Sequence, residues 1–118
     1  MNWFFRLFSR RGRVDALLKR AVMRSSGDLP GAIVDYTAVT EMEGDPHDLK
    51  AMAHFNRGLA YSQTQQMDLA MKDFQKVLSM PGVPANVTSA AKERLERLRR
   101  RAERGATTPP DVEAGEGP

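Results

Sequence analysis

The chain has 118 residues, 41% of them hydrophobic, carries a formal net charge of +3 and contains no cysteine. This length allows one small domain, and the lack of cysteine excludes disulfides and thiolate metal sites and favours a reducing compartment such as the cytoplasm. The charge is uneven, because residues 1–20 and 81–104 are net basic whereas residues 21–80 and 105–118 are net acidic. An anionic partner is therefore expected to contact the basic segments first.

Residues 1–12 form a segment that is both apolar and basic. Residues 2–8 read NWFFRLF, and further arginines follow them. A secretory signal has its positive region first and a longer apolar core, so export is not expected, nor is a transmembrane helix of roughly 20 apolar residues. Three hypotheses remain open for the aromatic side chains: peripheral contact with the inner face of a membrane, contact with a partner, or folding back over the first helix as a cap. These side chains are Trp3, Phe4, Phe5 and Phe8.

Five helices are predicted within one folded domain, residues 13–104, which makes the fold class all-α. In chain order they cover residues 13–25, 29–42, about 46–63, 67–80 and 85–104. Apolar residues recur at intervals of three and four in each, as expected for amphipathic helices. Asp28 is the predicted cap of the second helix, and Pro30 lies in its first turn, where a missing N–H is tolerated. Residues 105–118 have almost no large apolar side chain and are expected to form a disordered acidic tail.

The second and fourth helices repeat one another at an interval of 38 residues. This interval aligns Ala70 with Ala32 and Phe74 with Tyr36. Small residues such as Gly58 and Ala70 let two helix backbones approach closely, and large rings fill the space beside the crossing. We expect helix pairing to depend on Gly58, Tyr61, Ala70, Phe74, Ala32 and Tyr36.

Residues 51–81 resemble a tetratricopeptide repeat. The family's Gly, Tyr, Ala and Phe positions are present at the spacing of Gly58, Tyr61, Ala70 and Phe74, and Pro81 comes one residue early. His54 and Arg57 replace the usual Trp and Leu, but AHFNRGLAY resembles a common family variant. The resemblance implies antiparallel helix pairs that form an α-α superhelix. The repeats would be about 14–46 and 51–84, and the helix over 85–104 would be a C-terminal cap.

The resemblance also implies where a partner binds. In tetratricopeptide arrays the first helix of each pair lines a concave groove. Here that helix supplies Met52, Phe55, Leu59, Ser62 and Gln63, and the 38-residue interval adds Val14, Leu17, Ala21 and Arg24. This mostly apolar groove favours an apolar or amphipathic helical segment. Alternatively, Phe55 and Leu59 are simply covered by the fifth helix or by the N-terminal segment. Self-association is a further expectation, because two repeats and one helix fall short of about three units.

No catalytic, metal or cofactor site is predicted. His47 and His54 are the only histidines, and they have no convincing nucleophile, metal-ligand set or phosphate loop beside them. The sequence therefore predicts a non-enzymatic adaptor or scaffold for an unidentified protein or peptide. The alternative is a module that binds a membrane surface or nucleic acid through the N-terminal segment and the arginine-rich fifth helix. Nucleic acid is disfavoured, because acidic residues interrupt that helix and no aromatic side chain accompanies it.

Overall fold

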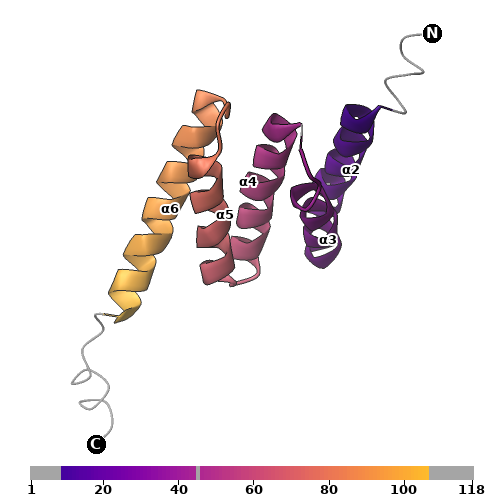
Figure 1. The fold of residues 1–118 in the computed structure, drawn as a ribbon. Coiled ribbons are helices and arrows are strands. Elements are labelled where there is room, and N and C mark those ends of the chain that lie inside the picture. The colour runs from indigo at the N-terminus through magenta and orange to yellow at the C-terminus, as the bar shows by residue number, and fades with distance from the viewer. Residues whose placement is uncertain (1–8, 45, 107–118) are drawn as a thin grey trace, which may run out of the picture.

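The structure, a computed structural model, describes residues 9–44 and 46–106. Within these ranges it is built of helices joined by short turns, which confirms the all-α class (Figure 1). The helices are α2 (Arg10–Arg24), α3 (Leu29–Thr40), α4 (His47–Gln63), α5 (Met67–Ser79) and α6 (Ala85–Ala106). The predicted contact residues Trp3, Phe4, Phe5 and Phe8 lie outside the described residues, as does the predicted acidic tail apart from its first two residues, which end α6.

Local capping explains where the first helices begin. The Ser9 hydroxyl accepts a hydrogen bond of 3.0 Å from the Gly12 N–H, so α2 starts three residues earlier than its apolar pattern predicts. The carboxylate of Asp28 accepts one of 2.9 Å from the Gly31 N–H, as expected for the cap of α3. By contrast, α4 begins after Pro46 without a hydrogen bond from a capping side chain.

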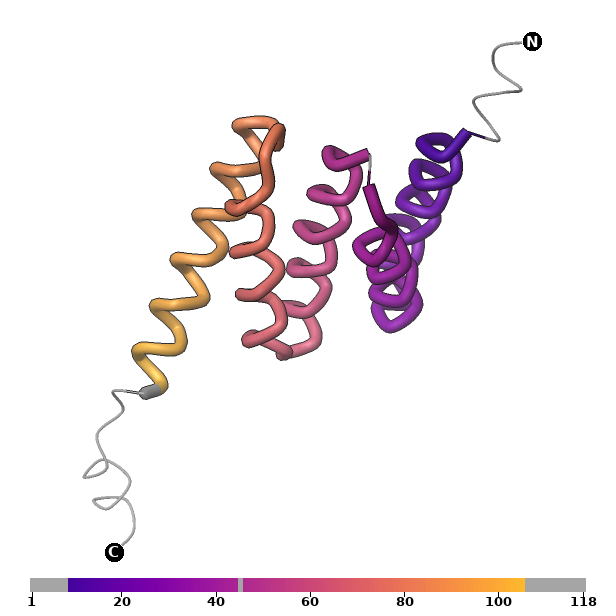
Figure 2. The backbone as a smooth tube through the Cα atoms, viewed as in Figure 1, coloured from indigo at the N-terminus to yellow at the C-terminus, as the bar shows by residue number. Residues whose placement is uncertain are grey.

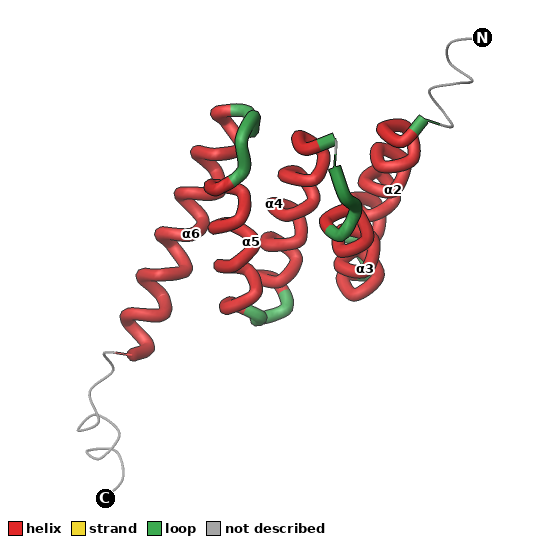
Figure 3. The backbone as a smooth tube through the Cα atoms, in the orientation of Figure 1, coloured by secondary structure: helices red, strands yellow, loops and turns green. Residues whose placement is uncertain are grey.

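Consecutive helices run antiparallel and lie side by side in chain order (Figure 2). The turns alternate between the two ends of the array, so α2, α4 and α6 all start at the same end (Figure 3). In this arrangement α4 contacts α3 on one side and α5 on the other, and it also touches α2 and α6. The last helix, α6, packs against α5 and forms the other end of the array.

Two clusters of buried side chains form the core, and α4 contributes to both. The first lies between α2 and α3 and includes one residue of α4: Val14, Leu18, Ala21, Ala32, Tyr36, Val39 and Ala53. The second lies between α5 and α6: Ala70, Phe74, Val77, Val87, Ala91, Leu95 and Leu98. Partly buried side chains of α4, including Met52, Phe55 and Leu59, pack against this second cluster. The middle helix therefore joins two cores into one unit.

Candidate functional site

The predicted pairing residues lie at the crossing of α4 and α5. Gly58 is buried, and a Cβ atom built on it would lie 2.8 Å from Cε1 of Phe74. Phe74 and Ala70 are fully buried, whereas Tyr61 is half-buried and has the guanidinium of Arg57 5.6 Å from its ring centroid. The corresponding Ala32 and Tyr36 are buried in the first cluster.

A buried carboxylate connects α5 to the two preceding helices. Arg57 donates two hydrogen bonds to Asp73, of 2.8 Å from Nε and 2.7 Å from Nη2, and Nδ1 of His54 lies 3.0 Å from the same carboxylate. Nη1 of Arg57 also donates to the hydroxyls of Thr37 and Thr40 on α3. Burial raises the pKa of Asp73, but the hydrogen bonds from Arg57 and His54 outweigh it and hold the pKa below its usual range. His54 and Arg57 thus form a polar network with Asp73.

A second buried carboxylate occupies the matching position of the first pair. Asp35 accepts hydrogen bonds of 2.9 and 2.8 Å from Arg20 and longer ones of 3.3 Å from Arg24. The hydrogen bond from Arg20 is the largest cause that lowers the pKa of Asp35. In each pair, an arginine just before a small buried residue binds the aspartate just before a large buried ring.

These two ion pairs correct the alignment of the first helices. Asp73 follows Asp35 by 38 residues, but Arg57 follows Arg20 by only 37. The 38-residue interval therefore holds for α3 and α5 but displaces α2 against α4 by one residue. Two of the residues that it assigned to the groove are core residues instead, Val14 at 1% exposure and Ala21 at 0%. Of the other two, Leu17 is partly buried against the first cluster and Arg24 pairs with Asp35.

Most of the predicted groove residues of α4 are partly buried. Met52, Phe55 and Leu59 are partly buried against the second cluster, and the rings of Phe55 and Phe74 lie 5.6 Å apart at a tilt of 58°. Ser62 is half-buried and Gln63 is exposed. Of these five residues, only Gln63, the last residue of α4, has an exposed side chain.

Two of these residues, Leu59 and Gln63, line a hollow of about 120 Å³ between α2, α3 and α4. The other lining residues are Val22, Ser25, Leu29, Tyr36, Asn56 and Ala60. Val22 and Ser25 are not among the predicted groove residues, but the 37-residue interval matches them to Leu59 and Ser62. Val22 is 51% exposed, so this hollow has an accessible apolar wall.

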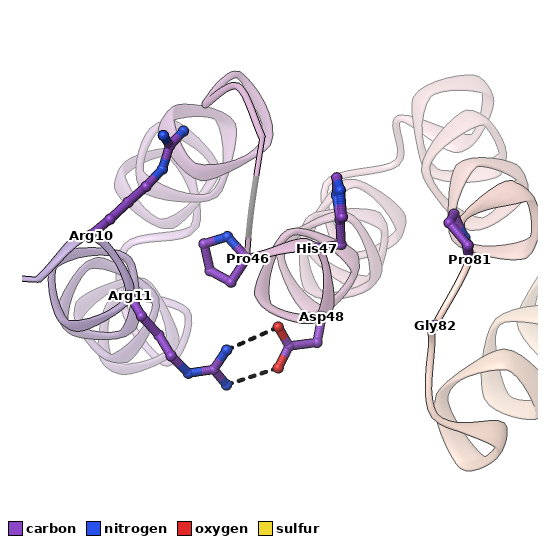
Figure 4. A pocket seen from close by; sticks show the side chains of 7 residues that line it. All are labelled: Arg10, Arg11, Pro46, His47, Asp48, Pro81 and Gly82. Atoms are coloured by element: carbon purple, nitrogen blue, oxygen red, sulfur yellow. Dashed lines mark hydrogen bonds and ion pairs between the residues drawn. The ribbon is translucent and has the colours of Figure 1, made fainter.

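A wider depression of about 710 Å³ lies at the end where α2 and α4 begin. Its lining residues are Arg10, Arg11, Pro46, His47, Asp48, Pro81 and Gly82 (Figure 4). Across it, Arg11 donates hydrogen bonds of 3.1 and 2.8 Å to both carboxylate oxygens of Asp48 and lowers the pKa of that group. Among the described residues, no cluster of three or more His, Cys, Asp or Glu side chains is arranged to hold a metal ion.

The far end of the array is basic. Beyond Leu98, the side chains of α6 are exposed from Arg99 to Gly105. No helix in the described part of the chain is long and apolar enough to cross a membrane. In comparisons with known proteins, the chain matches no family model, no curated protein and no solved structure.

Proposed function

We propose that this chain is a non-enzymatic protein-interaction adaptor with tetratricopeptide-like helix pairs. Its partner is an apolar or amphipathic protein segment that lies along α2 and α4. The observation that carries the proposal is the hollow with Val22 and Leu59 on its walls. Its volume of about 120 Å³ suits one apolar side chain of a partner.

The polar groups around this hollow suit a peptide backbone. Asn56 and Gln63 border the apolar walls with carboxamides, which both donate and accept hydrogen bonds. An apolar anchor beside such groups combines burial with orientation, as in other helical-repeat and groove complexes. Interaction through a rigid helical face requires no catalytic side chain.

Val22→Glu is the sharpest test of this surface. Because Val22 is 51% exposed, the charge should leave the fold intact while it places a carboxylate at the apolar wall. Peptides would be selected from a displayed random library on the full wild-type chain, and their affinities for each variant measured by calorimetry. We expect Val22→Glu to weaken binding at least about tenfold, which is roughly 1.4 kcal/mol.

Val34→Glu is the matched control, because Val34 is 65% exposed on α3 but does not line the hollow. It should bind the selected peptides as the wild type does. Phe55→Glu is less suitable, since Phe55 packs against Phe74 and its loss would disturb the core. Equal affinities of the Val22 and Val34 variants would reject the proposed surface.

An anionic surface is the second candidate partner, favoured by the exposed end of α6. One side of α6 carries four arginines at helical spacing, which are Arg94, Arg97, Arg101 and Arg104. Basic side chains near a helix C-terminus are also stabilised by the helix dipole. The full chain would be titrated with phosphatidylserine vesicles and with duplex RNA at low salt. Binding that the double variant Arg94→Gln, Arg101→Gln weakens would support this function, and no binding to either probe would reject it.

A further inference from the structure

The middle helix α4 is buried on two sides, and each side packs against a different part of the array. Ala51 and Gly58 lie on one side, where Gly58 meets Phe74 of α5. Ala53 and Ala60 lie on the other side, at 0% and 2% exposure, and Ala53 belongs to the cluster formed with α2 and α3. On this second side, α4 packs against α3, the helix that precedes it.

The matching side of α2 is open. At the 37-residue interval set by the two ion pairs, Ala53 corresponds to Ala16 and Ala60 to Met23. Ala16 is exposed and Met23 is 76% exposed, the highest value among the exposed large apolar side chains of the described residues. Figure 1 shows why: α2 is at the edge of the array, and no described helix lies beyond it. We call the side of α2 that carries Gly12, Ala16 and Met23 the outer face.

The composition of the outer face suits a close apolar neighbour. Gly12 and Ala16 are one helical turn apart, so an adjacent segment can approach the helix backbone closely. Met23 supplies a flexible apolar side chain at the far end of the same side. Lys19 lies on the same side of α2 between Ala16 and Met23, and it forms an exposed ion pair of 3.0 Å with Asp15.

Residues 1–8 of the same chain are the occupant that the connectivity favours. They enter α2 directly at Ser9, which is the end of the outer face nearest to Gly12. Eight extended residues span up to about 26 to 29 Å. The 15 residues of α2 are about 22 Å long, so the segment reaches Met23 if it turns back along the helix.

We propose that residues 1–8 cap the array by laying Trp3 and its neighbouring aromatic side chains on the outer face of α2. Each aromatic side chain can bury about 150–250 Å² of surface against such a face, whereas water leaves that apolar surface exposed. A tethered segment also has an effective concentration in the millimolar range, which gives it an advantage over a second copy of the chain at micromolar concentration. The cap closes the first end of the array as α6 closes the other.

Trp3 makes this proposal directly measurable, because it is the only tryptophan in the chain. The emission maximum of the full chain and its quenching by acrylamide would be recorded across a wide range of protein concentration. A docked Trp3 gives blue-shifted emission that is weakly quenched and independent of concentration. In Ala16→Glu and in Met23→Lys, the emission should shift to the wavelength of solvent-exposed tryptophan, while the circular dichroism of the helices stays unchanged.

Val34→Glu serves again as the control, because Val34 is exposed on α3 and is not part of the outer face of α2, and its Trp3 emission should equal that of the wild type. Three results would overturn the proposal. The first is a blue shift that appears only at high protein concentration, which would indicate a second copy of the chain. The second is solvent-like emission that shifts only when phospholipid vesicles are added. The third is a docked signal that both outer-face variants leave unchanged.

Discussion

Asp35 and Asp73 show how a buried charge is accommodated at single positions in this fold. Each carboxylate is almost fully buried, at 2% and 3% exposure, and each receives two hydrogen bonds from one arginine. Without these bonds a buried carboxylate would be strongly unfavourable. The arginines therefore act as obligatory partners, even though Arg20 itself is largely exposed.

Arg57→Ala tests this dependence. The substitution leaves Asp73 buried with His54 as its only remaining side-chain partner, and it also removes the hydrogen bonds to Thr37 and Thr40. We expect a loss of about 3 kcal/mol in the free energy of unfolding, measured by urea denaturation. Arg97→Ala, which removes an exposed pair with Glu93, should cost less than about 0.5 kcal/mol. Similar losses in the two variants would contradict the obligatory role.

The same two carboxylates predict how stability depends on pH. The folded-state pKa values of Asp35 and Asp73 lie below the unfolded-state value of about 3.9. Their contribution is therefore fully present above that value and is lost as the pH falls through the folded-state pKa values. We expect the free energy of unfolding to fall steadily below about pH 4. The double variant Asp35→Asn, Asp73→Asn should be less stable at neutral pH but show a flatter acid dependence. The free energy of unfolding would be measured by urea denaturation at each pH. If the double variant lost stability with falling pH as steeply as the wild type does, this assignment would be contradicted.

At the scale of helices, the sequence predicts the elements well and their mutual register less well. Apolar spacing and breakers place all five described helices within about three residues of their bounds, because amphipathic spacing and capping are local properties. An observed helix end differs from the predicted one where a single capping side chain sets it, as Ser9 does at the start of α2. Which residues of α2 correspond to those of α4 depends instead on which arginine of α2 binds Asp35 of α3. That contact forms only when the helices pair.

Gly58 limits how closely α4 and α5 can pack. Helix propensity alone would make Gly58→Ala stabilising by about 1 kcal/mol. The added methyl would lie 2.8 Å from Phe74, which is fully buried and cannot move into solvent. Overpacking of this kind costs about 1–3 kcal/mol, so we expect a net loss of stability in thermal denaturation. Gly27→Ala, with no atom within 4 Å of the new Cβ, should change the midpoint little. A stabilising Gly58→Ala would contradict the close contact.

At the scale of the whole molecule, the position of α4 between two clusters decides how stability is distributed. Ala53 joins the first cluster, while Met52, Phe55 and Leu59 pack against the second. In an array where each helix contacts mainly its neighbours, the ends open more readily than the middle. The sequence predicts this end-to-end order, but not the hollow beside Val22, because that hollow combines residues from α2, α3 and α4.

Hydrogen exchange would reveal this gradient along the chain. The amides of α3, α4 and α5, which have neighbours on two sides, should exchange slowest and report the global free energy of unfolding. The turns of α6 after Leu98 should exchange fastest, because their side chains make no buried contact. Deletion of residues 1–8 should accelerate exchange in α2 and leave α6 unchanged if those residues cap the outer face. Mass spectrometry of the two chains under identical conditions measures both effects, and equal protection of α4 and the end of α6 would contradict the nearest-neighbour account.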